Sequence, residues 1–171
     1  MKKLFIIPLL LILLFRVNAQ ESSIGLRCGG LSAVTYKYVD EKGHGFELML
    51  GQQKNGMKFT GLVERHRSPN FYHTTDLKVY TGIGGHVGYT RYMVKESRLE
   101  GDTWYYREAN HTSPVIGGDF ILGAEYTFER VPVSLSLDYK PYVELFGEEN
   151  FRIDLWDFGF SVRYIINNLK S

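Results

Sequence analysis

The sequence predicts an all-β fold: a closed eight-stranded antiparallel transmembrane β-barrel with short turns at one end and one long loop at the other. Three observations predict it. Apolar and polar residues alternate over eight successive segments, as in strands whose two faces meet different surroundings. Aromatic residues make up 15% of the chain and there are 18 glycines, which suits strands joined by tight turns. Most segments reach the length of about 9 to 11 residues with which a tilted strand crosses a bilayer.

The first 19 residues predict a cleaved secretory signal peptide. Two lysines precede an apolar run over residues 4–15, and Val17 and Ala19 occupy the small-residue positions of a peptidase site. The run is shorter than the roughly 20 residues of a transmembrane helix. We therefore expect export, cleavage after Ala19, and one barrel domain over residues 20–171.

The eight predicted strands follow one another without a linker or an internal repeat. Their ranges are 23–30, 33–40, 44–52, 57–67, 76–89, 115–128, 133–143 and 154–166. The connections after the second and sixth strands are tight, whereas residues 90–114 form the longest one. Short turns in the periplasm and longer loops outside are typical of transmembrane barrels. We therefore predict that residues 90–114 are an extracellular loop.

The polar face of each strand decides between a membrane barrel and the alternative, a secreted soluble β-sandwich or lipocalin-like barrel. This face mixes charges with glycine and serine, which suits the narrow interior of eight strands. The alternation places twelve ionisable residues inside: Arg27, Lys37, Glu47, Glu64, Lys78, His86, Asp119, Glu125, Asp138, Lys140, Asp157 and Arg163. Five are basic, six are acidic and one is histidine, and buried charges must be paired. We expect a structural charge network that plugs the lumen, with a proton or ion path as the alternative.

Three stretches resemble a known family: GIGGHVGY (82–89), GGDFILGAEYTFERVPVSLSLDYKP (117–141) and FGFSVRYII (158–166). They are similar to the small outer-membrane β-barrel proteins of Gram-negative bacteria, in particular to the outer membrane protein beta-barrel domain family. The resemblance covers most of the mature chain. It implies an eight-stranded barrel in the outer membrane, in contact with outer-membrane lipid and lipopolysaccharide, and it implies almost nothing about activity.

No motif predicts an enzyme, a cofactor site or a metal site with any specificity. His66 and Ser68 resemble the His-x-Ser pair of outer-membrane lipid A deacylases, which makes a lipid-modifying enzyme the first alternative function. A small pore is the second alternative.

The histidines show no metal-ligand spacing. The net charge of +1 argues against a nucleic-acid partner, and Cys28, the only cysteine, cannot form an internal disulfide.

The long loop is the predicted place for a specific function. Trp104, Tyr105 and Tyr106 are large aromatic residues within it, and such residues are enriched at protein interfaces. The alternative is that they fold back on the barrel rim or into the lipid headgroups. We therefore expect a non-enzymatic outer-membrane barrel with a structural or accessory role. Its expected partner is another outer-membrane protein complex, bound through this loop or through the lipid-facing wall.

Overall fold

The computed structural model describes residues 21–53, 56–69, 76–100, 103–146 and 151–167, so the predicted signal peptide lies outside the described residues. The described residues form ten strands. They are β1 (Glu21–Gly29), β2 (Ser32–Val39), β3 (His44–Gln53), β4 (Gly56–Arg67), β5 (Leu77–Glu100), β6 (Thr103–Thr127), β7 (Val133–Tyr139), β8 (Tyr142–Phe146), β9 (Phe151–Asp154) and β10 (Phe158–Asn167).

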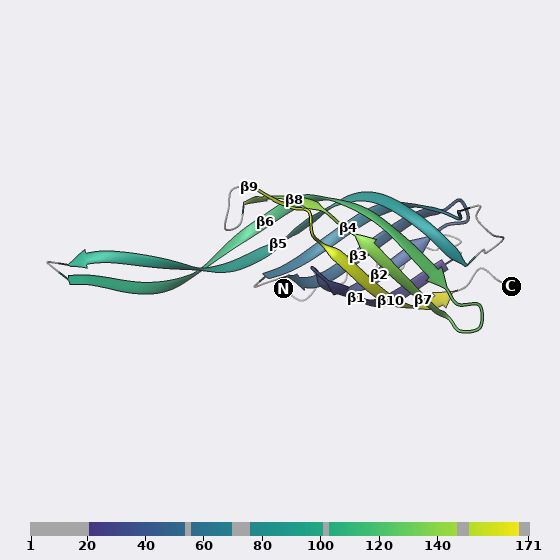
Figure 1. Cartoon of the computed structure of the whole chain (residues 1–171), viewed down its shortest axis with the longest axis horizontal. Helices are drawn as coiled ribbons and strands as arrows, with labels where there is room; N and C mark the ends of the chain where they lie inside the picture. Colours follow the sequence, from purple (N-terminus) through teal and green to yellow (C-terminus); the bar gives the residue numbers. More distant parts are fainter. Residues whose placement is uncertain (1–20, 54–55, 70–75, 101–102, 147–150, 168–171) are drawn as a thin grey trace, which may run out of the picture.

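The ten strands occupy eight positions around a closed antiparallel barrel (Figure 1), which confirms the predicted fold. Successive strands pair from β1 to β7, β10 pairs with β7, and β1 pairs with β10 to close the ring. β7 and β8 both pair with β6, so together they fill one position. β9 pairs with β8 and leads into β10, which makes the eighth position.

Two of the predicted strands are interrupted: the strand predicted over 133–143 divides into β7 and β8, and the one predicted over 154–166 has a gap between β9 and β10. Lys140 and Pro141 separate β7 from β8, because proline has no backbone N–H to donate to the ladder. Other backbone hydrogen bonds hold the chain in place at this gap. Phe120 N–H donates to the Pro141 carbonyl over 3.0 Å, and Lys140 N–H donates to the Asp157 carbonyl over 2.7 Å.

The two ends of the barrel differ. At one end, here the terminal end, β1 begins beside the last residues of β10, and the connections at 40–43 and 128–132 lie there. The 40–43 turn is held by Asp40, whose Oδ1 accepts the His44 backbone N–H over 2.7 Å. That hydrogen bond lowers the pKa of Asp40, and Gly43 supplies the positive φ of 77° that the turn needs.

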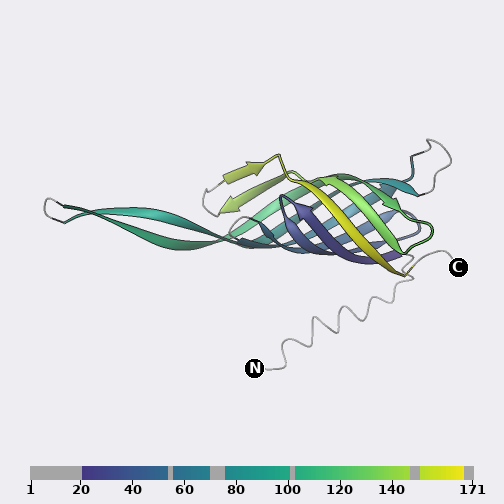
Figure 2. The same ribbon diagram turned by 60° about the horizontal axis from the view of Figure 1, so that its bottom comes forward.

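At the other end, here the ribbon end, β5 and β6 run on beyond the barrel as a two-stranded ribbon (Figures 1 and 2). Their antiparallel register continues from Leu77↔Tyr126 to Glu100↔Thr103. The segment 90–114, predicted as a loop, is therefore mostly paired strand. Its polar and aromatic sequence lacks a strict alternation, but backbone pairing between two adjacent strands does not require one.

The barrel carries its apolar side chains outside. Ile83 is 68% exposed and Leu137 is 65% exposed, whereas Arg163 and Glu47 are fully buried. Exposed aromatic residues lie near both ends of the barrel, including Tyr36, Phe46 and Tyr164 at the terminal end and Trp156 and Phe158 towards the ribbon end. An apolar outer band with aromatic girdles around a polar interior is the organisation of a small outer-membrane β-barrel, not of a soluble sandwich.

None of the described residues belongs to a helix that is long and apolar enough to cross a membrane.

Candidate functional site

Apart from the Glu21–Lys78 pair at the terminal end, the described residues of the lumen form two separate groups of ion pairs. The group nearer the terminal end, here the terminal-end network, has Arg163 at its centre. Arg163 donates to Glu47 over 2.6 Å and to Glu125 over 3.3 Å, and it also donates to the hydroxyls of Thr35 and Ser136. Because Arg163 is fully buried, every one of its bonds replaces a bond to water.

Lys37 is the second cation of the terminal-end network. Its Nζ lies 3.2 Å from Glu47, 3.0 Å from Glu64 and 3.6 Å from Glu125. It also lies 3.9 Å from the centre of the Tyr80 ring, a cation–π contact in a dry environment. Lys37 and Arg163 thus share Glu47 of β3 and Glu125 of β6. Glu64 adds β4 through Lys37, and Ser136 adds β7 through Arg163.

His66 extends this network towards the terminal end. Its Nε2 is 2.9 Å from Glu64, and its ring stacks on Tyr80 with centroids 5.0 Å apart. Both side chains are buried inside the barrel. The stacking fixes the ring plane, and Glu64 fixes the direction of Nε2.

The second group, here the ribbon-end network, is a chain of alternating charges. Arg27 bonds Asp138 over 2.6 Å and Asp157 over 3.1 Å, and Arg27 also donates to the Leu31 carbonyl. Asp157 also forms an ion pair with Lys140 over 3.3 Å, and Lys140 forms another with Asp119 over 2.8 Å. These residues come from β1, β6, β7 and the segments flanking β8 and β10.

The ribbon-end network continues through His86 to its last cation. His86 Nδ1 lies 2.7 Å from Asp119 and Nε2 lies 3.3 Å from Glu144, which pairs in turn with Lys58. Tyr142 covers this part: its ring meets His86 edge-on at 5.4 Å and lies 4.2 Å from Lys58 Nζ. The network therefore spans the lumen from β1 and β7 to β4 and β5.

An apolar layer lies between the two networks on β4 and β6. Its members are Leu31, Ala33, Met49, Leu62 and Ile121, which are all buried and cluster together with Tyr80. On β4, Leu62 lies between Glu64 of one network and Lys58 of the other. On β6, Ile121 separates Glu125 from Asp119 in the same way. Side chains without polar groups thus fill the middle of the lumen on this side.

Each network, as the described residues form it, is one positive charge short when its histidine is neutral. The terminal-end network has two cations (Lys37, Arg163) against three carboxylates (Glu47, Glu64, Glu125), which gives 2 − 3 = −1. The ribbon-end network has three cations (Arg27, Lys58, Lys140) against four carboxylates (Asp119, Asp138, Glu144, Asp157), which gives 3 − 4 = −1.

Inward-facing glycines seat the large side chains of both networks. A Cβ atom on Gly25 would lie 2.6 Å from Cγ of Arg163, and one on Gly159 would meet the guanidinium of Arg27. Gly123 faces Tyr80 and Gly117 faces His86 in the same way. The glycines that the sequence places between charges therefore leave the space that those large side chains need in a narrow barrel.

The structure places all twelve sequence-predicted lumen residues inside the barrel. Eleven are buried, and Lys78, whose side chain is 25% exposed, pairs with Glu21 over 2.9 Å at the terminal end. Sequence reasoning missed four ionisable residues among those described in the lumen: Glu21, Lys58, His66 and Glu144. Lys58 lies between two apolar outward residues, so the alternation could have found it. Glu144 and Glu21 lay just beyond the predicted strand ends.

The residues of the alternative enzymatic hypothesis lie apart. His66 is buried in the lumen, whereas Ser68 is exposed beyond the end of β4. Within the described part of the chain, His66 Nδ1 has no hydrogen-bond partner. His66 and Ser68 therefore do not form the hydrogen-bonded base–nucleophile pair that such catalysis needs. No group of three or more His, Cys, Asp or Glu residues among those described is placed to hold a metal ion.

The predicted partner residues Trp104, Tyr105 and Tyr106 lie on β6 near the tip of the ribbon, opposite Leu99, Arg98 and Ser97 of β5. Their backbone belongs to the described ribbon, and their side chains lie outside what the structure describes.

No model of a known protein family and no curated protein matches this chain. Among solved structures, the chain is similar to the N-terminal β-barrel domain of Pseudomonas aeruginosa OprF. The identity is 14% and the TM-score is 0.47, over 86% of this chain and 99% of that one. This similarity concerns the fold, and no comparison identifies a family for this chain.

Proposed function

We propose that this protein is an integral outer-membrane β-barrel with a plugged lumen and no catalytic centre. In this proposal its role is structural, or accessory to another outer-membrane complex. The ribbon is its partner-binding element, and lipid and lipopolysaccharide surround its wall. The observation that carries the closed lumen is the pair of ion networks with an apolar layer beside them. An open pore needs a water-filled path, and eight strands leave an interior that side chains fill.

The closed lumen predicts a specific result in vesicles. The mature protein, refolded into phospholipid vesicles, is expected to show heat-modifiable gel mobility, which reports the folded barrel, and no steady single-channel conductance above that of empty bilayers. Steady conductance from the unmodified barrel would contradict the plugged lumen and favour the pore.

The ribbon predicts where a partner binds. Removing residues 94–109 and joining Met93 to Asn110, which pair directly, through an Asn-Gly turn keeps the barrel strands in register. A mild-detergent pull-down from native membranes should then lose the partner that the full-length chain recovers, while heat-modifiable mobility remains. A partner retained by the shortened variant would place the binding surface on the barrel wall instead of the ribbon.

A further inference from the structure

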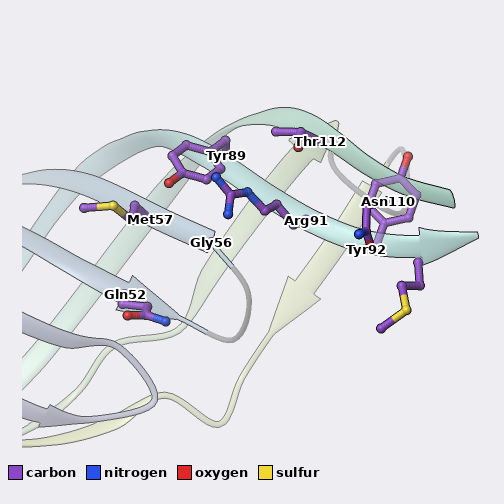
Figure 3. A pocket seen from close by; sticks show the side chains of 9 residues that line it. Gln52, Gly56, Met57, Tyr89, Arg91, Tyr92, Asn110 and Thr112 are labelled. Carbon is purple, nitrogen blue, oxygen red and sulfur yellow. The ribbon is translucent and has the colours of Figure 1, made fainter.

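A hollow lies where the ribbon leaves the barrel, on the outer face (Figure 3). It has a volume of about 830 Å³ and is lined by residues of β3, β4, β5 and β6. Among the described residues that line it, Arg91 is the only cationic one. The polar side chains of Gln52, Asn110 and Thr112 and the apolar side chains of Met57 and Met93 complete most of its wall.

Arg91 is exposed, and its charge is not paired with any carboxylate of the described residues. Its guanidinium lies 5.4 Å from the centre of the Tyr89 ring, two residues before it on the same face of β5. The lumen cations differ from it, since each of them has at least one carboxylate within ion-pair distance. Arg91 therefore offers its charge and its donors to a group from outside the chain.

The depth of Arg91 in the membrane follows from the outer face of β5. Leu77, Val79, Ile83 and Val87 are exposed apolar residues along this face. The ten residue steps from Leu77 to Val87 span about 34 Å of strand. At a tilt of about 40° this corresponds to roughly 25 Å of membrane, the usual height of the apolar band. Tyr89 then occupies the aromatic girdle, and Arg91 lies one step further out, at the level of the lipid headgroups.

An apolar track leads from the hollow into this band. Met57 pairs with Tyr89, and Phe59 pairs with Val87 and with Leu50 of β3. Met57, Phe59, Val87 and Leu50 are between 44% and 52% exposed, and all face outward. A molecule in the hollow can thus meet Arg91 with one end and the apolar wall with the other. A lipid has that shape, whereas a soluble anion would use only the first part.

We propose that this hollow binds the anionic phosphate headgroup of a membrane lipid. Arg91 pairs with the phosphate, and Gln52, Asn110 and Thr112 supply hydrogen bonds beside it. The acyl chains lie along Met57, Phe59 and Val87. Arginine suits this task because its planar fork matches two phosphate oxygens at once. The inference rests on the membrane-inserted barrel of the proposed function and adds a defined lipid site to it.

The test uses a fluorescent reporter inside the hollow. Tyr89→Trp, combined with Trp104→Phe and Trp156→Phe, leaves a single tryptophan under Arg91. This reporter protein is refolded into vesicles that contain phosphatidylglycerol or phosphatidylcholine with brominated acyl chains, which quench nearby tryptophan. We expect an apparent preference of about 2- to 5-fold for phosphatidylglycerol next to the reporter, the size of one exposed ion pair. Adding Arg91→Gln should reduce the preference to about 1, and Arg91→Lys should retain part of it.

Arg130→Gln is the matched control, since it removes an exposed arginine from the turn at the terminal end. It should leave the preference unchanged, and an equal loss would overturn the proposal in favour of general surface charge. Equal quenching by both lipids in the reporter protein that retains Arg91 would also overturn it. Abolition of the preference by inorganic phosphate, but not by sodium chloride of the same ionic strength, would mean that the site takes a free anion. Absence of quenching by either lipid would overturn the site alone if heat-modifiable mobility persists, and the membrane barrel as well if that mobility is lost.

Discussion

Replacement of Arg163 by methionine is expected to lower the free energy of unfolding by about 3 to 5 kcal/mol, the usual cost of removing one partner from a buried ion pair. Arg163 is fully buried and neutralises Glu47 and Glu125. Without Arg163, these two carboxylates have only Lys37 as a cation. Glu64 also depends on Lys37, so three carboxylates would then share one ammonium group. The measurement is urea unfolding of the refolded barrel in phospholipid vesicles, followed by tryptophan fluorescence.

The control for this experiment is Arg152→Met. Arg152 pairs with Asp154 over 2.8 Å, and its side chain is 29% exposed. Removing it should cost about 0 to 1 kcal/mol, as for other exposed pairs. Adding Glu47→Gln to Arg163→Met should recover part of the loss, because it removes one uncompensated charge. A loss below about 1 kcal/mol for Arg163→Met, with no effect of the second substitution, would show that the network does not hold the barrel together.

Gly117→Ala and Gly118→Ala, one residue apart on β6, are expected to have opposite consequences. A Cβ atom on Gly117 would clash with the backbone oxygen of Val143 and with the ring of His86, which is held on both sides by Asp119 and Glu144. The ring cannot move without breaking a hydrogen bond, so we expect a loss of about 1 to 3 kcal/mol in the free energy of unfolding, as for other overpacked interiors. The same urea titration measures it.

Gly118 faces outward and has room. A Cβ atom there would lie 3.7 Å from the nearest atom, which belongs to Val143. Gly118→Ala should therefore change the free energy of unfolding by less than about 0.5 kcal/mol, or raise it slightly, because alanine restricts the unfolded chain. Equal losses for the two variants would mean that Val143 and His86 do not close the space above Gly117.

The inside and outside of the barrel could be predicted because side chains alternate with a strict period of two along a strand. Once one apolar face is recognised in the last strand, Asp157 and Arg163 must lie on the other face. The same rule applies to each strand, and so the twelve predicted residues all point into the lumen. The ends of strands follow no such rule, which is why Glu21 and Glu144 were missed.

The partners of each charge could not be predicted. Arg27 and Asp138 are 111 positions apart in the sequence, and they meet because β1 pairs with β10 and β10 pairs with β7 in one particular register. A shift of this register would keep both residues inward and separate them. The paired ribbon could not be predicted either, because it depends on the point at which β5 and β6 leave the barrel wall.

The sequence by itself thus determined that eight amphipathic strands form a barrel with its apolar face outside and its polar face inside. The period of two and the need to bury or expose each face are local properties of the chain. Only the tertiary structure decided that the inner charges form two networks, that glycines seat Arg27, Arg163, Tyr80 and His86, and that Arg91 stands over a hollow at the edge of the apolar band. Those features depend on strand register and tilt, which bring together residues far apart in the sequence.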